Sequence, residues 1–414
     1  MLFFSDMDNR ILKRQFLSFS HDDGVGLILL LQVFSKGCTF ALCSFARERI
    51  LMSVASNRNH SSILCRFRGL MLGMVVMYAA FAMAQGGSSV YSFLELPSSA
   101  RLNGLGGSTV SIKEAELSSV VCNPALLNPS TDKVLQLNYA HYLQGVNIGS
   151  VMYGHNYKDN YFAAAVHYLN YGKFDYADEF GSLLGTSFSA QDMCITLAYA
   201  RQLGPCFTVG ASIKPVYSHY ESYSAFALAA DVGGHFQTKD STFQLGISLQ
   251  NIGWQLKGFY TDESGQHREH LPLNLQLGLN YRFRHAPIRL SMTIHNIQRW
   301  DLGYQVTNQP SRETYSDEEV VADNSVAWYD MMFRHTIFAI DIVPKSDRFY
   351  LTLSYNHRHR MELGLKDHRS FAGFAVGAGI RIRNFQLGAA FSQQTKGGYI
   401  YQVSLSMNIN EYLK

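Results

Sequence analysis

The feature that most constrains the fold is a period-two alternation of apolar and polar residues, which runs from Lys133 to the end of the chain. In residues 243–250, Phe, Leu, Ile and Leu alternate with Gln, Gly, Ser and Gln, and residues 273–284 and 401–409 repeat the pattern. Because successive side chains of a strand point to opposite faces, each segment predicts a strand with one apolar face and one polar or glycine face. We expect about fourteen such strands of roughly ten residues each.

The lengths of the connections decide between two architectures. A soluble sandwich turns its apolar faces inward, whereas a transmembrane barrel turns them toward lipid and keeps a polar interior. Every second connection is a tight turn, and the long connections all fall on the odd-numbered positions: residues 172–187, 252–272, 299–332 and 359–370. Tight turns at one end and long loops at the other are typical of outer-membrane barrels. The sequence therefore predicts an all-β fold, a transmembrane antiparallel β-barrel of about fourteen strands over residues 133–414.

Residues 85–132 do not alternate, and we expect them to plug the lumen of this barrel. The segment contains three of the nine prolines, a glycine cluster at 104–107 and several leucines. A disordered linker is the alternative, but linkers are usually poor in such apolar residues. The plug residues that we single out are Pro97, Arg101, Gly106, Gly107, Asn123, Pro124 and Ala125.

Residues 66–84 have the features of a secretory signal peptide. Two arginines precede an apolar run, and Ala82-Met83-Ala84 provides a small-x-small cleavage motif before Gln85. The apolar run is far shorter than the ~20 residues of a transmembrane helix. We therefore expect an exported protein in the outer membrane of a Gram-negative bacterium. Residues 1–65 are interpreted as an extension upstream of the true start.

Charge and motifs exclude several classes of function. Residues 1–84 hold nine of the 35 basic and five of the 32 acidic residues, which leaves 26 and 27 and a net charge of −1, so nucleic acid is not an expected partner. Cys122, Cys194 and Cys206 form no disulfide framework. The glycines at 104–107 lack the strand and helix of a phosphate-binding loop. We therefore expect no enzyme activity, no cofactor and no metal site.

Two sets of side chains are candidates for contacts. Lumen-facing arginines near the tight turns are expected to pair with plug carboxylates, because buried charges need partners; a pore-lining selectivity role is the alternative. These arginines are Arg282, Arg284, Arg289, Arg381 and Arg383, and the carboxylates are Glu95, Glu114 and Glu116. Aromatic residues on the long loops are expected to contact a surface partner, because such residues anchor interfaces. They are Phe174, Tyr176, Phe259, Tyr260, Tyr304, Tyr315 and Trp328, and the longest loop, 299–332, is the first candidate.

Five motifs resemble those of the PorV/PorQ family of the type IX secretion system. They are YSFLELPSSAR at 91–101, GLGG at 104–107, NPALLNP at 123–129, YLNYGKFD at 168–175 and FSAQD at 188–192. The resemblance covers residues 85–414, and the Asn-Pro-Ala element is shared more widely with FadL-like plugged barrels. It implies a fourteen-stranded barrel that anchors a surface protein similar to PorZ.

In that family the anchor works beside PorU and PorV, in a complex that joins secreted cargo to anionic lipopolysaccharide. The resemblance therefore implies outer-membrane lipid, lipopolysaccharide and these proteins as partners. The alternative function is a FadL-like transporter of a hydrophobic substrate. A transporter needs an apolar path through the lumen, whereas the inward positions of the predicted strands are mostly Asn, Gln, Ser, Gly and Arg.

Overall fold

The computed structural model describes residues 91–409, except 115, 143–144, 179, 181, 263–264, 267, 303–326, 345, 347, 364–370 and 396–397. The predicted signal peptide at 66–84 and the extension at 1–65 lie outside the described residues. They stay predictions, as does the start of the mature chain at Gln85.

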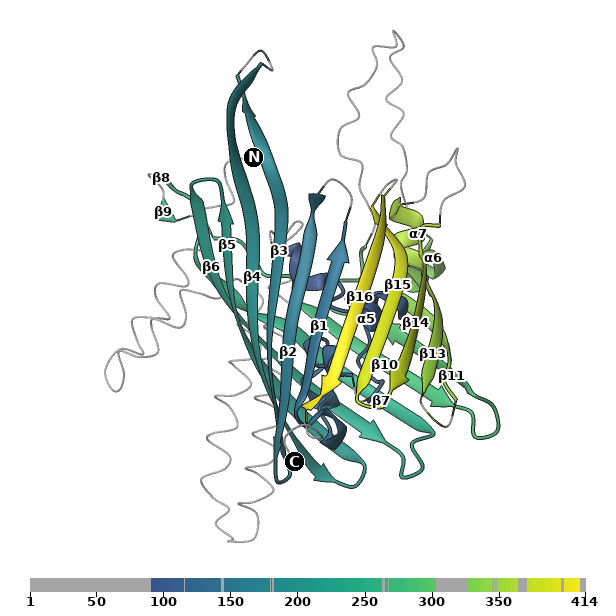
Figure 1. The fold of residues 1–414 in the computed structure, drawn as a ribbon. Helices are drawn as coiled ribbons and strands as arrows, with labels where there is room; N and C mark the ends of the chain where they lie inside the picture. Colours follow the sequence, from purple (N-terminus) through teal and green to yellow (C-terminus); the bar gives the residue numbers. More distant parts are fainter. Residues whose placement is uncertain are drawn as a thin grey trace, which may run out of the picture. The chain divides into compact units, whose positions relative to one another are not determined.

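Fourteen antiparallel strands form a closed barrel, which confirms the predicted fold class (Figure 1). Closure is made by β1 and β16, which pair from Val134 with Asn408 to His141 with Tyr401. The barrel strands are β1 (Val134–His141), β2 (Asn147–Tyr157), β3 (Asn160–Ala177), β4 (Leu183–Gly204), β5 (Phe207–Tyr220), β6 (Tyr223–Gln237), β7 (Phe243–Lys257), β10 (Asn274–Arg282), β11 (Ile288–Ile294), β12 (Thr336–Ile342), β13 (Phe349–Asn356), β14 (Phe374–Ile382), β15 (Phe385–Thr395) and β16 (Gly398–Asn408).

The two faces of the wall differ as the alternation predicts. On β13, Leu351 and Leu353 point outward and are 45% and 49% exposed, while Thr352 between them points inward and is 1% exposed. The same difference holds on β16, where Val403 is exposed and Ser404 is buried. An apolar exterior around a largely polar interior is the arrangement of a barrel that spans a lipid bilayer.

The connections follow the predicted parity. Those after β2, β4, β6, β10, β12 and β14 are tight and lie at one end, here called the turn end. The other end, the loop end, carries the long connections after β7, β11 and β13. Since turns of such barrels are periplasmic, the turn end faces the periplasm and the loop end faces outward.

One expected loop is a strand extension instead. Residues 172–187 were expected as a loop, but β3 continues to Ala177 and β4 begins at Leu183. Phe174 pairs with Phe188 and Asp175 with Ser187 across the extension. The prediction was wrong because this stretch lies beyond the lipid layer, where a strand no longer needs an apolar outer face.

Short elements cover the loop end. Helices α6 (Trp328–Arg334) and α7 (His357–Leu363) are joined by Asp330, whose Oδ1 lies 2.6 Å from Nε2 of His357. Strands β8 (Thr261–Asp262) and β9 (Gly265–Gln266) form a separate small hairpin. Within the described part of the chain, no helix is long and apolar enough to cross a membrane.

Residues 91–132, here called the plug, lie within the ring of strands, as predicted. They form short helices rather than strands, because their prolines and glycines interrupt extended pairing. The helices are η2 (Ser92–Glu95), α5 (Ala100–Gly104), η3 (Leu117–Val121), η4 (Pro124–Leu126) and η5 (Pro129–Thr131). Figure 1 shows α5 behind β16 and β15, on the inner side of the wall.

Candidate functional site

The first half of the plug is organised by α5. Ser99 caps the helix, since its Oγ accepts a hydrogen bond from the backbone N–H of Leu102 at 3.2 Å. The helix ends in a turn that includes Gly106 and Gly107, whose φ values are +89° and +109°. Only glycine adopts such values without strain, so the Gly-Leu-Gly-Gly motif is a helix terminator.

The second half depends on the Asn123-Pro124-Ala125 motif. Oδ1 of Asn123 accepts from the N–H of Ala125 at 2.9 Å and so caps η4, and Pro124 occupies the first helical position. Nδ2 of Asn123 donates to the carbonyl oxygen of Val110 at 2.8 Å, which ties the two halves of the plug together. Asn123, Pro124 and Ala125 are all fully buried.

Polar side chains of the wall form hydrogen bonds with backbone groups of the plug. Ser404 Oγ accepts from the N–H of Ala100 at 2.8 Å, and Gln402 donates to the carbonyl oxygen of Pro97 at 3.1 Å. From other sides of the barrel, Gln136 accepts from Leu117, and Asn280 donates to Ser111. Without these contacts, backbone N–H and C=O groups of the plug would be buried without hydrogen-bond partners. The inward polar residues of the wall provide these partners.

Glycines of the wall let the plug approach closely. A Cβ on Gly246 of β7 would lie 1.7 Å from the carbonyl oxygen of Val110. A Cβ on Gly377 of β14 would lie 2.9 Å from Cα of Gly104 in α5. The inward glycines are therefore part of the surface that receives the plug.

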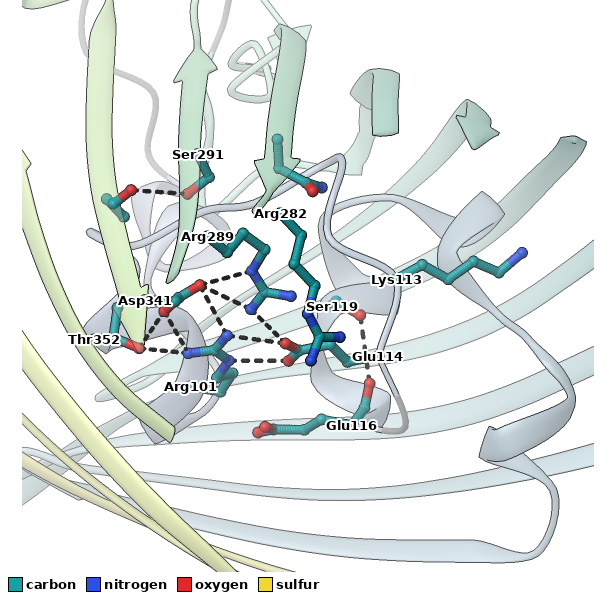
Figure 2. A network of polar contacts seen from close by, with 12 residues as sticks. Arg101, Lys113, Glu114, Glu116, Ser119, Arg282, Arg289, Ser291, Asp341 and Thr352 are labelled. Carbon is teal, nitrogen blue, oxygen red and sulfur yellow. Dashed lines mark hydrogen bonds and ion pairs between the residues drawn. The ribbon is translucent and has the colours of Figure 1, made fainter. Parts of the chain in front are cut away.

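A buried ion-pair network joins the plug to β11 and β12 (Figure 2). Arg101 contacts Glu114 at 3.0 Å and Asp341 at 3.0 Å, and Arg289 contacts the same two carboxylates at 2.5 Å and 2.8 Å. Thr352 is hydrogen-bonded to both Arg101 and Asp341. Two cations thus face two anions, and the network is electrically balanced.

The pKa values of Glu114 and Glu116 in the plug are shifted in opposite directions. Burial raises the pKa of Glu114, but the adjacent Arg101 and Arg289 outweigh it and hold the pKa far below its ordinary value. Within the described residues, Glu116 contacts neutral groups rather than an arginine, and burial raises its pKa to about 7. Its oxygens accept hydrogen bonds from Ser118 and Gln136 instead.

The predicted arginine–carboxylate pairing is confirmed for Arg289. Arg289 pairs with Glu114, whereas Arg284 pairs with Asp240 in a neighbouring turn and Arg381 donates to Gln386. Arg383 is exposed in its turn. Asp341 was missed, although an aspartate on the inward face of an otherwise apolar strand is a signal that could have found it.

The lumen is less polar than expected. On strands β1 to β6 and on β16, a set of inward wall residues is apolar and packs on Tyr91, Phe93, Leu117 and Leu127 of the plug. These wall residues are Ala140, Ile148, Met152, Tyr161, Ala165, Leu169, Cys194, Ala198, Val216, Ala227 and Ile400, here called the apolar sector. The expected polar inward face does not extend to this sector, because the apolar side of the plug needs apolar contacts.

Most of the predicted partner-binding aromatics are described. Phe174 and Tyr176 lie on the β3 extension, and Phe259 stacks on Tyr220 with ring centroids 5.0 Å apart. Tyr260 is exposed, and Trp328 at the start of α6 is 71% exposed. Tyr304 and Tyr315 lie outside the described residues. The five aromatics within the described residues are therefore spread over the β3 extension, the connection after β7 and α6.

No protein-family model and no curated protein matches the sequence. Among solved structures, the P. putida toluene transporter TodX is 13% identical, with a TM-score of 0.47 over 76% of this chain and 99% of its own. The Ralstonia pickettii toluene transporter TbuX is 10% identical, with a TM-score of 0.45 over 76% and 97%. A Pseudomonas aeruginosa FadL homologue is 12% identical, with a TM-score of 0.44 over 75% and 98%. We transfer no residue role and no substrate from similarities this weak.

Proposed function

We propose that this chain is a plugged outer-membrane barrel that acts as a non-enzymatic anchor for a protein on the cell surface. The observation that carries the proposal is the β3–β4 hairpin. Strand β4 has 22 residues and β3 has 18, whereas about 9–11 tilted residues cross a membrane. Figure 1 shows that this hairpin reaches beyond the neighbouring strands at the loop end.

The extended hairpin has the properties of a binding surface. Its aromatic rings are ordered by stacking, since Phe188 lies 5.3 Å from Phe174 and 5.0 Å from Tyr176 between ring centroids. Its tip exposes Phe180, Leu183 and Leu184, which are 85%, 70% and 59% exposed. Apolar side chains on a rigid element outside the lipid layer favour protein contact, because they lose little conformational freedom on binding.

The closed lumen supports an anchor rather than a conduit. The plug is bonded to the wall by backbone hydrogen bonds, close glycine contacts and the balanced network around Arg101. By resemblance, the partner is a surface protein similar to PorZ, and the assembly includes proteins similar to PorU and PorV at the lipopolysaccharide surface.

Shortening the hairpin tests the proposal. Lys173 and Ser189 are paired across the extension, so an Asn-Gly turn joining them removes residues 174–188 and keeps the membrane-spanning part. We expect this variant to fold and to lose its surface partner to the medium. The matched control removes residues 261–266 of β8 and β9 and should keep the partner. Quantitative mass spectrometry of membrane and medium fractions measures both, after a pull-down from wild-type membranes has identified the partner.

The contradicting outcome is a folded hairpin variant that retains its partner fully. Release by the control but not by the hairpin variant would contradict the hairpin as the site. Shortening loop 299–332 in parallel tests the loop that the sequence favours.

The apolar sector favours a second candidate, a FadL-like transporter of a hydrophobic substrate. It offers apolar contact along one side of the lumen, but the cavity among Leu117, Met152 and Ala165 measures only about 10 Å³. A substrate could therefore use this side only if the plug moved. Uptake of labelled toluene by cells with and without the protein tests this function, and equal uptake would exclude it for toluene.

A further inference from the structure

A chamber of about 520 Å³ lies between the plug and the turn end of the barrel. Its floor is formed by plug residues 113, 114, 116 and 128–130. Its sides are formed by residues at the turn ends of the strands, among them Pro205, Ser241 and Arg348. The volume is within the range of small-molecule sites, which is about 300–1,000 Å³.

Cations from five parts of the chain line the chamber. They are Lys113 of the plug, Arg282 of β10, Arg289 of β11, Arg348 before β13 and Arg381 of β14. Among the described lining residues, the carboxylates are Glu114 and Glu116. Figure 2 shows the side chain of Arg282 directed toward Glu114, and Arg282 also lines the chamber.

Two of these cations donate to neutral groups rather than to carboxylates. Glu114 is already shared between Arg101 and Arg289, and Asp341 neutralises the second of these arginines. Lys113 Nζ donates to the neutral hydroxyl of Thr208 at 3.0 Å. Arg381 donates to the neutral amide oxygen of Gln386 at 2.8 Å. These two cations therefore keep donors for a further acceptor, since ammonium and guanidinium groups carry several N–H donors each.

We propose that the chamber binds a small soluble anion, bearing phosphate or carboxylate groups, that enters from the periplasm. Guanidinium groups suit such oxygens because they donate two parallel hydrogen bonds, and a low-dielectric wall around the chamber strengthens the attraction. A soluble anion fits better than a lipid head group, because the closed barrel separates the chamber from the bilayer.

Calorimetric titration of the detergent-solubilised full barrel with inorganic pyrophosphate tests the proposal, with citrate as the carboxylate arm. Lys113→Gln/Arg381→Gln should weaken binding at least about tenfold, since each hydrogen bond to a charged group contributes roughly that factor. Lys113→Arg retains the charge and should bind nearly as well as wild type. Binding should also weaken as salt increases.

The matched control, Lys173→Gln/Lys257→Gln, removes the same two charges at the loop end and should bind as wild type does. Heat-modifiability on gels establishes that each variant is folded. Saturable binding of either anion that depends on Lys113 and Arg381 supports the proposal. Absence of binding for both anions, or equal affinity in wild type and the chamber variant, overturns it.

Discussion

Arg101 is the residue on which the closed state of the barrel depends most. It is 3% exposed and contacts Glu114 in the plug, Asp341 on β12 and the ring of Tyr350 on β13, whose centroid lies 4.4 Å from its guanidinium carbon. Without Arg101, two carboxylates would remain buried beside one arginine. Removing one partner of a buried ion pair is costly, because the other charges lose their compensation.

Arg101→Gln should therefore lower the free energy of unfolding by about 3–5 kcal/mol. The matched control is Arg358→Gln, which breaks the partly exposed pair with Glu362 within α7 and should cost less than about 1 kcal/mol. Urea unfolding of both variants in detergent micelles measures the difference. Equal losses in the two variants would mean that the network does not hold the plug.

Glu116 makes the stability of the folded state depend on pH. Burial raises its pKa from 4.5 to about 7, so the folded state binds a proton that the unfolded state releases between these values. The contribution of Glu116 to the free energy of unfolding is fully present below pH 4.5. It is lost as the pH rises through 7. Glu116→Gln should remove this part of the slope, so the variant should gain stability relative to wild type between pH 5 and pH 8. Unfolding midpoints across that range measure the difference, and parallel curves would contradict it.

At the scale of elements, the contact between Val110 of the plug and β7 depends on shape. Gly246 faces the carbonyl oxygen of Val110, so Gly246→Ala should push this part of the plug from the wall and destabilise it by about 1–3 kcal/mol. Cys122 lies buried nearby, and maleimide should label it faster in this variant. Cys194→Ala/Cys206→Ala provides the background for labelling.

Gly149→Ala is the matched control for this contact. A Cβ on Gly149 meets nothing within 4 Å, and its neighbours Ile148 and Ser150 are the inward residues of β2. Labelling of Cys122 should therefore stay at the rate of the background protein. If Gly246→Ala also leaves that rate unchanged, the glycine contact does not hold the plug.

Sequence periodicity predicts the strands well because lipid outside and polar contacts inside impose opposite demands on alternate residues. It fails at the β3–β4 extension, where Lys173 and Asp175 continue the strand outside lipid and the alternation no longer has a cause. Periodicity also does not predict which plug residues contact which residues of the wall. Arg101 and Asp341 are 240 positions apart, and nothing local in either segment specifies the other.

At the scale of the whole molecule, the structure has three levels: a chamber at the turn end, a plug across the lumen and an extended hairpin at the loop end. Arg282, Arg289 and Arg381 of the chamber could be predicted as lumen-facing from their strands, whereas Arg348 could not. The neutral acceptors of Lys113 and Arg381 could not be predicted either. Which acceptor each of these two cations contacts depends on how the plug folds. The proposed anchor requires the plug to stay in place, whereas the transporter alternative requires it to move.

A disulfide between plug and wall tests that difference directly. Cβ of Ala100 in α5 lies 3.7 Å from the position of a Cβ on Gly388 of β15, which suits a disulfide bond. Tyr350→Phe removes the hydroxyl that a side chain at Gly388 would meet. The native cysteines to be replaced by alanine are Cys122, Cys194 and Cys206.

The measurement is retention of the surface partner and uptake of labelled toluene by cells that carry Ala100→Cys/Gly388→Cys, compared after oxidation and after reduction. Our account predicts equal partner retention and equal uptake in the two states, because the plug stays in place while the anchor works. Uptake that stops on oxidation and returns on reduction would contradict it, as would partner release on oxidation alone.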